Sequence, residues 1–330
     1  MASTTPTLSP GTEPVAEQRV ELKVARSAGD RVYRTVSYAA GATTFVILAA
    51  IGTFLLLEAW PALKEGGWGF FTETQWNPDG QQFGIGAVMV LTVEIAVVAL
   101  VFAVPVAIGA ALFITEYAPR SWRRPLTSLI DLLAAVPSII YGLWGLFFLQ
   151  PRLIKVSDWL GEHLGFLPIF SVKSGNLAGS TFIAGVVVSL MVLPICASIM
   201  REVFSQAPPG EKEGALALGG TRWGMIRTVV LPFGKGGIIG GAMLGLGRAL
   251  GETIAVALII SPIFDPSVRI LDGGGNSISA LIALRWGEAT PFSRQALMAA
   301  GLALFAVTLT VNAIASVVVV RSRSGAATEI

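Results

Sequence analysis

The chain has 330 residues, of which 53% are hydrophobic and 13% are charged, and its mean hydropathy is +0.71. A soluble domain of this length carries about a quarter of its residues as charged side chains, which excludes a core surrounded by water. We therefore expect a membrane protein. The 23 basic and 21 acidic residues leave a net charge of +2, which gives no reason to expect a nucleic-acid partner.

Two residue types that build catalytic and metal sites occur once each. Cys196 lies in an apolar run, and His163 is the sole histidine. A disulfide within the chain and a thiolate zinc site are excluded. Ser-His or Cys-His catalysis is disfavoured, because a single histidine is present to act as the base. An intramembrane enzyme is thus a remote alternative. We expect no catalytic residue, no metal site and no cofactor bound by this chain.

Six stretches reach the roughly 20 apolar residues that a bilayer-crossing helix requires. They lie at 36–57, 84–115, 126–149, 178–200, 236–263 and 296–320. The second stretch contains Pro105 and exceeds one crossing, which predicts a tilted or kinked helix. The expected fold class is all-α, a polytopic membrane protein with six transmembrane helices. We expect one transmembrane domain at 36–320, between a disordered cytoplasmic tail at 1–35 and a cytoplasmic tail at 321–330.

The distribution of basic residues predicts the orientation. If the N-terminus is inside, most basic residues face the cytoplasm, as the positive-inside rule requires. Arg248 lies within a span, and the basic residues left outside are Lys64, Arg152, Lys155, Lys173, Arg269, Arg285 and Arg294. This favours a multi-pass protein of the cytoplasmic membrane with both termini in the cytoplasm. The tryptophans of the expected external connections, 58–83, 150–177 and 264–295, are typical of short helices at the lipid interface.

The cytoplasmic connection between spans four and five has its own punctuation. Pro208 and Pro209 favour the start of a helix. Gly219 and Gly220 favour a left-handed turn at its end. We expect a short helix, a sharp turn and a second amphipathic stretch up to Pro232, although spacing alone also fits an ordinary surface loop.

Segment 213–232 reads EGALALGGTRWGMIRTVVLP and resembles the EAA loop of ABC-importer permeases. The matching places hold Glu213, Ala215, Gly219, Val229, Leu231 and Pro232, whereas Gly214 replaces the usual Ala. In that family the short helix docks in a cleft of a separate ATPase subunit. The resemblance implies that this loop, at 208–232, couples to an ATPase through Glu213, Ala215, Gly219 and Pro232. The chain has no G-x-x-x-x-G-K-[ST] sequence, so ATP and Mg would bind to the partner.

Two further stretches narrow the resemblance. AVPSIIYGLWGLFFL at 135–149 and GLGRALGETIAVALII at 245–260 resemble the PstC-type permeases of phosphate importers, with WNPDGQQFG at 76–84 as weaker support. The resemblance implies a type I ABC importer permease that translocates phosphate. Its implied partners are a second homologous permease (PstA-like), a dimer of ATPase subunits (PstB-like), an external phosphate-binding protein (PstS-like) and membrane lipid. One alternative is a permease for molybdate, sulfate or phosphonate. Another is an ATP-independent transporter or channel, although the EAA loop argues against it.

Two ionisable residues lie in the fifth expected span. Arg248 is about 20 Å along a helix from Lys235, near the bilayer midplane, where an isolated Arg costs roughly 2.5–3.5 kcal/mol. Glu252 follows one turn later on the same face. A structural ion pair is one interpretation. The other is a substrate path in which Arg248 binds the oxyanion and Glu252 orients Arg248 or accepts a hydrogen bond from protonated phosphate. In the family, the matching Arg and Glu are associated with transport.

Two glycines and two acidic residues are the other notable residues within the expected spans. Gly241 and Gly245 lie on the stripe of Arg248 and Glu252 with small-x-x-x-small spacing. This spacing fits close helix packing and also fits helices that slide between two states. Glu94 and Asp131 are expected to be protonated or hydrogen-bonded structural acids.

Overall fold

The computed structural model describes residues 28–173, 175–260 and 269–322, with side chains up to 317. It contains two units, which divide between Ala50 and Ile51. The first unit is the start of α1 (Ala28–Gly66), where every described residue is exposed. Residues 28–35 are helical although they were assigned to the tail. Asp30 in the first turn suits a helix N-terminus,, and no Gly or Pro interrupts residues 30–40. The remaining tail residues lie outside the described ranges.

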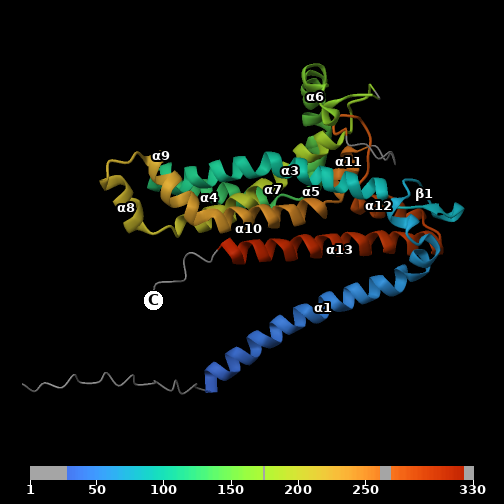
Figure 1. Ribbon diagram of the computed structural model, residues 1–330, viewed down its shortest axis with the longest axis horizontal. Helices are drawn as coiled ribbons and strands as arrows, with labels where there is room; N and C mark the ends of the chain where they lie inside the picture. The colour runs from blue at the N-terminus through green and yellow to red at the C-terminus, as the bar shows by residue number, and fades with distance from the viewer. Residues whose placement is uncertain (1–27, 174, 261–268, 323–330) are drawn as a thin grey trace, which may run out of the picture. The chain divides into compact units, whose positions relative to one another are not determined.

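The regular structure in the described residues of the second unit consists of helices and one small hairpin (Figure 1). After the rest of α1, its α-helices are α2 (Gly69–Thr72), α3 (Gly86–Leu112), α4 (Arg120–Ala135), α5 (Ser138–Trp144), α6 (Gln150–Leu164), α7 (Thr181–Ser205), α8 (Pro209–Ala217), α9 (Arg222–Met225), α10 (Leu231–Leu250), α11 (Ile254–Ile259), α12 (Ile278–Arg285) and α13 (Pro291–Ser322). Three π-helical turns extend helices, namely η2 (Phe113–Tyr117), η3 (Gly145–Leu149) and η5 (Ile226–Val230). The 3₁₀ turns are η1 (Pro78–Gly80), η4 (Pro168–Phe170) and η6 (Trp286–Glu288). In the hairpin, β1 (Trp76–Asn77) pairs antiparallel with β2 (Gln82–Phe83), with Trp76 opposite Phe83.

Six helical stretches in the described residues are long and apolar enough to cross a membrane. They are Ala28–Gly66, Gly86–Tyr117, Ser138–Leu164, Thr181–Ser205, Arg222–Leu250 and Pro291–Val317. The all-α class and the number of spans are thereby confirmed. The second, fourth and sixth stretches overlap the expected spans closely, and Pro105 lies inside α3.

The third span differs from the prediction of an unbroken helix at 126–149. The chain is extended at Val136 and Pro137, which separates α4 from α5. Pro137 explains this break, because proline disfavours helical geometry in the residue before it. The continuous helical stretch is Ser138–Leu164 instead. In Figure 1, α4 and α5 follow the direction of α3 and α7, whereas α6 turns away.

The fifth span also differs, at both ends. Its helix begins at Arg222 rather than at residue 236, because α9, η5 and α10 run on without interruption. It ends at Leu250, and residues 251–253 separate it from the short helix α11. The second cytoplasmic stretch was therefore wrongly predicted as a separate element ending at Pro232. Residues 261–263 of the expected span lie outside the described ranges.

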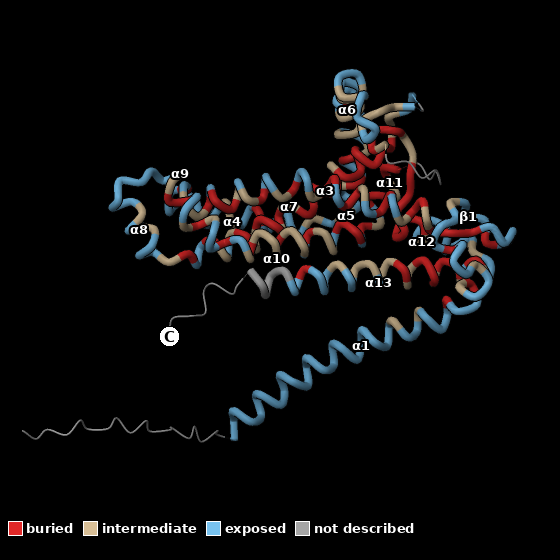
Figure 2. Tube along the Cα trace, in the orientation of Figure 1, coloured by how far each residue is buried: buried red, intermediate tan, exposed pale blue. Residues whose placement is uncertain are grey.

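The core of the second unit lies between α3, α7 and α10 (Figure 2). Small residues bring these helices together. A Cβ atom on Gly185 of α7 would lie 2.5 Å from Cγ1 of Val98 on α3, and one on Gly237 of α10 would lie 2.6 Å from Val203 on α7. Contacts this short show that the α7 backbone touches a side chain of α3, and that the α10 backbone touches a side chain of α7,. The three helices thus form a closely packed frame for the segments described next.

Candidate coupling segment and substrate path

The helix α8 lies in the connection between the fourth and fifth spans, where a short helix was expected. It begins after Pro208, with Pro209 in its first turn and Glu211 near its positive end,. Glu213 is exposed, and Ala215 is half-buried. The short helix expected between the two prolines and the two glycines is therefore present.

The end of α8 explains the pair of glycines. Gly219 has φ +81°, and its N–H donates to the carbonyl of Leu216 at 3.0 Å. The N–H of Gly220 donates to the carbonyl of Ala215 at 3.2 Å. These two bonds form a Schellman turn, which satisfies the last carbonyls of the helix. Leu218, at the turn, is 92% exposed.

The return from this turn leads directly into the fifth span. The hydroxyl of Thr221 accepts a hydrogen bond from the N–H of Gly224 at 3.0 Å and so caps α9,. One turn later, the N–H of Leu231 bonds to the carbonyl of Ile226, five residues back. This π turn widens the helix just ahead of Pro232, whose ring would otherwise collide with a carbonyl of the preceding turn. Pro232 is exposed and helical.

A salt bridge connects α8 to the end of α3. The ammonium of Lys212 lies 2.7 Å from Oε1 of Glu116 in η2, and the two side chains are 19% and 9% exposed. The pair spans a crevice of about 340 Å³ between η2, α4, α7 and α8. Other polar residues lining this crevice are Thr115, Arg123, Thr127, Arg201, Glu202 and Ser205. This contact was not predicted, because the two residues are 96 positions apart and no local pattern in the sequence links them.

The glycines of α10 face α7. Gly241 and Gly245 are buried. A Cβ atom on Gly241 would lie 3.2 Å from the carbonyl oxygen of Cys196, and one on Gly245 would lie 2.7 Å from its sulfur. The thiol of Cys196 donates to the carbonyl of Gly241 at 3.2 Å. The structure thus places both glycines at a close helix contact within the chain.

Arg248 and Glu252 do not lie on one continuous helix, contrary to the prediction. Arg248 is exposed in the last turn of α10, whereas Glu252 is 7% exposed in the break that follows. Oε1 of Glu252 accepts from the N–H of Ala255 at 3.3 Å, and its carbonyl accepts from Ser279 at 2.6 Å. Within the described part of the chain, no ion pair joins Arg248 to Glu252. The interpretation as a structural pair is therefore wrong for this chain, because Gly251 ends the helix and Glu252 turns inward.

The PSIIYG stretch brings the two broken spans together. The hydroxyl of Tyr141 donates to the carbonyl of Leu133 at 2.9 Å, across the break between α4 and α5. A Cβ atom on Gly142 would lie 2.9 Å from Cα of Ala255, so α5 packs directly on the backbone of α11. The two sequence stretches that suggested a phosphate permease thus meet in the fold.

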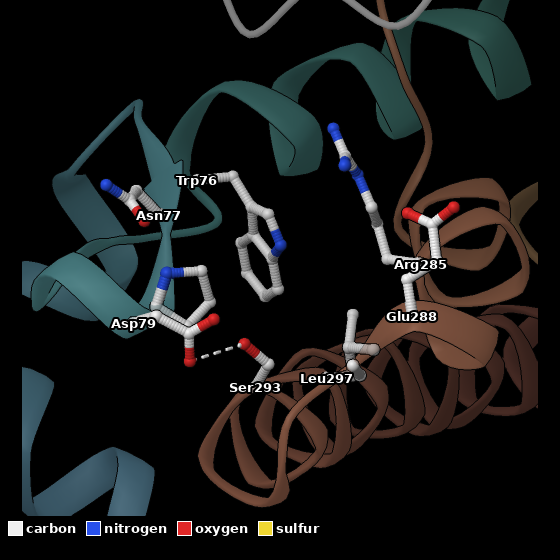
Figure 3. Close-up of a pocket in the computed structure, with 9 residues that line it drawn as sticks. Trp76, Asn77, Asp79, Arg285, Glu288, Ser293 and Leu297 are labelled. Carbon is white, nitrogen blue, oxygen red and sulfur yellow. Dashed lines mark hydrogen bonds between the residues drawn. The ribbon is translucent and has the colours of Figure 1, made fainter.

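The hairpin of the WNPDGQQFG stretch is fixed to α13 (Figure 3). Oδ1 of Asp79 accepts hydrogen bonds from Thr290 at 2.6 Å and from Ser293 at 3.2 Å. A cavity of about 170 Å³ lies beside these bonds, with Trp76 on the hairpin side and Arg285 among the residues opposite. These bonds give the stretch a structural role.

The other singled-out residues lie apart from these segments. Asp131 is exposed on α4. Oε2 of Glu94 is buried and has no hydrogen-bond partner among the described residues. His163 lies in α6, where its ring stacks on Trp159 at 4.6 Å between centroids. No cluster of three potential metal ligands occurs in the ranges that the structure describes.

Comparison with known proteins places this arrangement in a family. The family model described as "Binding-protein-dependent transport system inner membrane component" matches residues 103–324, which include α8 and both broken spans. The chain therefore belongs to this family of transport permeases. Two solved structures agree in fold. A bacterial ABC transporter for the import of alginate gives a TM-score of 0.54 at 18% identity, over 88% of this chain and 99% of that chain. The MetNI methionine ABC transporter gives 0.51 at 14% identity, over 70% and 93%.

Curated relatives identify the branch within the family. The phosphate transport system permease protein PstC 2 of Mycobacterium tuberculosis is 44% identical over 315 residues, which cover 92% of this chain and 96% of the relative. PstC of Xylella fastidiosa is 41% identical over 304 residues, covering 91% and 93%. The chain is thus a PstC-type member of the family, as the sequence stretches indicated.

Proposed function

We propose that this chain is a permease subunit of an ATP-driven importer that moves inorganic phosphate across the cytoplasmic membrane. Two findings together support this proposal: the chain has an exposed helix of the EAA type, and its relatives are named as phosphate transport permeases. Those names favour phosphate over molybdate, sulfate and phosphonate. The EAA-type helix has no evident use in a transporter that works without an ATPase.

The proposed ATPase contact is the outer surface of α8 and the turn after it. Leu216, Leu218 and Trp223 are all exposed there, and a group of large apolar side chains on a protruding segment favours a protein partner. Glu213 is exposed on the same helix. ATP and Mg would bind to that partner, an ATPase dimer. A second homologous permease and an external phosphate-binding protein would complete the complex.

Two substitutions test this contact. Glu213→Lys reverses an exposed charge, and Gly219→Pro cannot adopt the positive φ of the Schellman turn. In the complex reconstituted with its binding protein, both should insert normally and lose phosphate-stimulated ATP hydrolysis. Lys235→Gln, an exposed change on α10, is the control and should leave hydrolysis unaltered. Normal hydrolysis and uptake in both test variants would reduce the segment to a surface loop.

We propose that Arg248 lines the phosphate path. The guanidinium is exposed at the end of α10 and forms no ion pair with described residues, so its forked donors remain available to an oxyanion. Glu252 holds the break behind it through Ala255 and Ser279 and is a positioning residue in this proposal. The second permease would face Arg248 across the path.

Arg248→Gln tests that assignment. Removal of a cation from a span makes insertion easier, so complex yield should be normal while phosphate uptake is abolished. Glu252→Gln keeps an acceptor for the Ala255 N–H and should lose much less uptake. The role of Arg248 is refuted if Arg248→Gln transports phosphate at the normal rate, as measured with radioactive phosphate in proteoliposomes.

A further inference from the structure

The contact between α8 and the membrane helices has one charged component. α8 packs against α9 and η5, the segments that follow it in the chain. Its link to a different part of the fold is the Lys212–Glu116 salt bridge, which joins residues 96 positions apart. Of the two ion pairs in the described residues, the other joins Arg269 to Asp272, three positions away. Lys212–Glu116 therefore ties separate helices together.

The surroundings of the pair indicate that charge, rather than packing, holds α8 at this point. Lys212 is the one α8 residue that lines the crevice beside η2, α4 and α7. Its side chain lies at the edge of this crevice, where its ammonium contacts Glu116 of η2. Both side chains are largely shielded from water, so their attraction is screened less than that of a surface pair.

Glu116 lies at a position from which a displacement of α8 would be passed to the packed core helices. It lies in η2, the π turn that continues α3, and α3 packs along α7 for much of its length. The chain then turns at Ala118 and Pro119 into α4. A pull on Glu116 would therefore act on α3 and on the start of α4.

We propose that Lys212 and Glu116 are positioning residues that transmit movement of α8 to α3. The chain connects α8 to α7 before it and, through α9 and η5, to α10 after it, and the salt bridge adds a direct connection to the end of α3. This inference rests on the proposed function, because the movement would originate in an ATPase docked on α8. Through this pair, one displacement of α8 moves α3 and α10 together.

Charge reversal separates this role from simple folding. Lys212→Glu and Glu116→Lys each place like charges across the crevice, whereas the double variant restores an attractive pair. In proteoliposomes with the binding protein, each single variant should keep basal ATP hydrolysis. Each should import about fivefold less phosphate per ATP, in line with coupling energies typical between sites. The double variant should return to within about twofold of the original ratio.

Neutral and control variants keep the test decisive. Lys212→Gln removes the attraction without adding repulsion and should import less phosphate per ATP, as the charge-reversed variants do. It keeps the test informative if a charge-reversed variant fails to assemble. Lys235→Glu, with the same charge change at an exposed place on α10, should keep the original ratio. The proposal is overturned if Lys212→Gln imports normal phosphate per ATP, or if the double variant stays as uncoupled as the singles.

The outcomes also separate this inference from the proposed function. Loss of hydrolysis in Glu213→Lys together with a normal ratio in Lys212→Gln would leave the ATPase contact in place and reject the salt bridge as a connection. If Glu213→Lys and Gly219→Pro are both normal, the ATPase contact itself fails.

Discussion

The helices α7 and α8 follow one another in the chain and differ in almost every physical respect. Most residues of α7 are buried between α3, α10 and α4, whereas α8 has no buried residue at all. α7 is defined by contacts inside the chain. α8 is defined by its caps, its turn and one salt bridge, and its exposed surface is the place of the proposed ATPase contact. The sequences of two neighbouring helices can therefore be constrained differently, that of α7 by packing inside the chain and that of α8 by the proposed contact with another protein.

The largest expected effect comes from adding volume to the packed helix. Gly185→Leu would drive a side chain into Val98, whose Cγ1 lies 2.5 Å from the place of a Cβ atom. Overpacking costs about 1–3 kcal/mol and occasionally more, so the yield of folded protein in detergent should fall severely. Gly210→Leu on α8, where nothing lies within 4 Å of a Cβ atom, is the control. Equal yields for the two variants would contradict the contrast.

The next effect is in chemical accessibility. Cys196 on α7 is buried, so the native chain should resist a membrane-impermeant thiol reagent. Leu218→Cys, after α8, should react in inside-out vesicles and not in intact cells. His163→Cys should react in intact cells, and cysteines at positions 20 and 325 should not. Labelling of the two termini from outside would reverse the proposed orientation.

The smallest effect should come from repairing the EAA-type helix. Gly214→Ala replaces a glycine that has nothing within 4 Å of a Cβ atom by the best helix former. A gain of up to about 1 kcal/mol for α8 is expected. Thermal unfolding of the purified chain should shift little, because this helix contributes few contacts to the core. A loss of folded protein would show that Gly214 faces a contact absent from the single chain.

Sequence reasoning succeeded where a local pattern has a local cause. The apolar runs gave the class and the number of spans, and the proline and glycine pairs gave both ends of α8. It failed at the breaks. Pro137 ends α4 at the preceding residue, a signal present in the sequence but outweighed by the apolar run. At Glu252, helical spacing suggested a partner one turn away, although its actual partners Ala255 and Ser279 depend on how α12 packs.

Long-range pairing set the other limit. Nothing near Lys212 in the sequence indicates Glu116, because the contact exists only once α3 and α8 have been brought to the same end of the fold. The substrate path was limited in the same way. Arg248 was recognised as a costly charge in an apolar span, but its exposed position follows from the end of α10 at Leu250.

The π turn η5 controls the direction in which α8 points. A π turn holds one more residue than the α-helical turn it replaces, and each residue of an α-helix advances about 100° around the axis. The segments that precede η5 are therefore rotated, relative to the glycine face of α10, by about that angle from where an unbroken α-helix would place them. Conversion of residues 226–230 to regular α-helix without a deletion would turn Trp223 and the helix α8 to another azimuth while leaving their sequences intact. The direction in which α8 points around the axis of the fifth span therefore depends on the π turn η5.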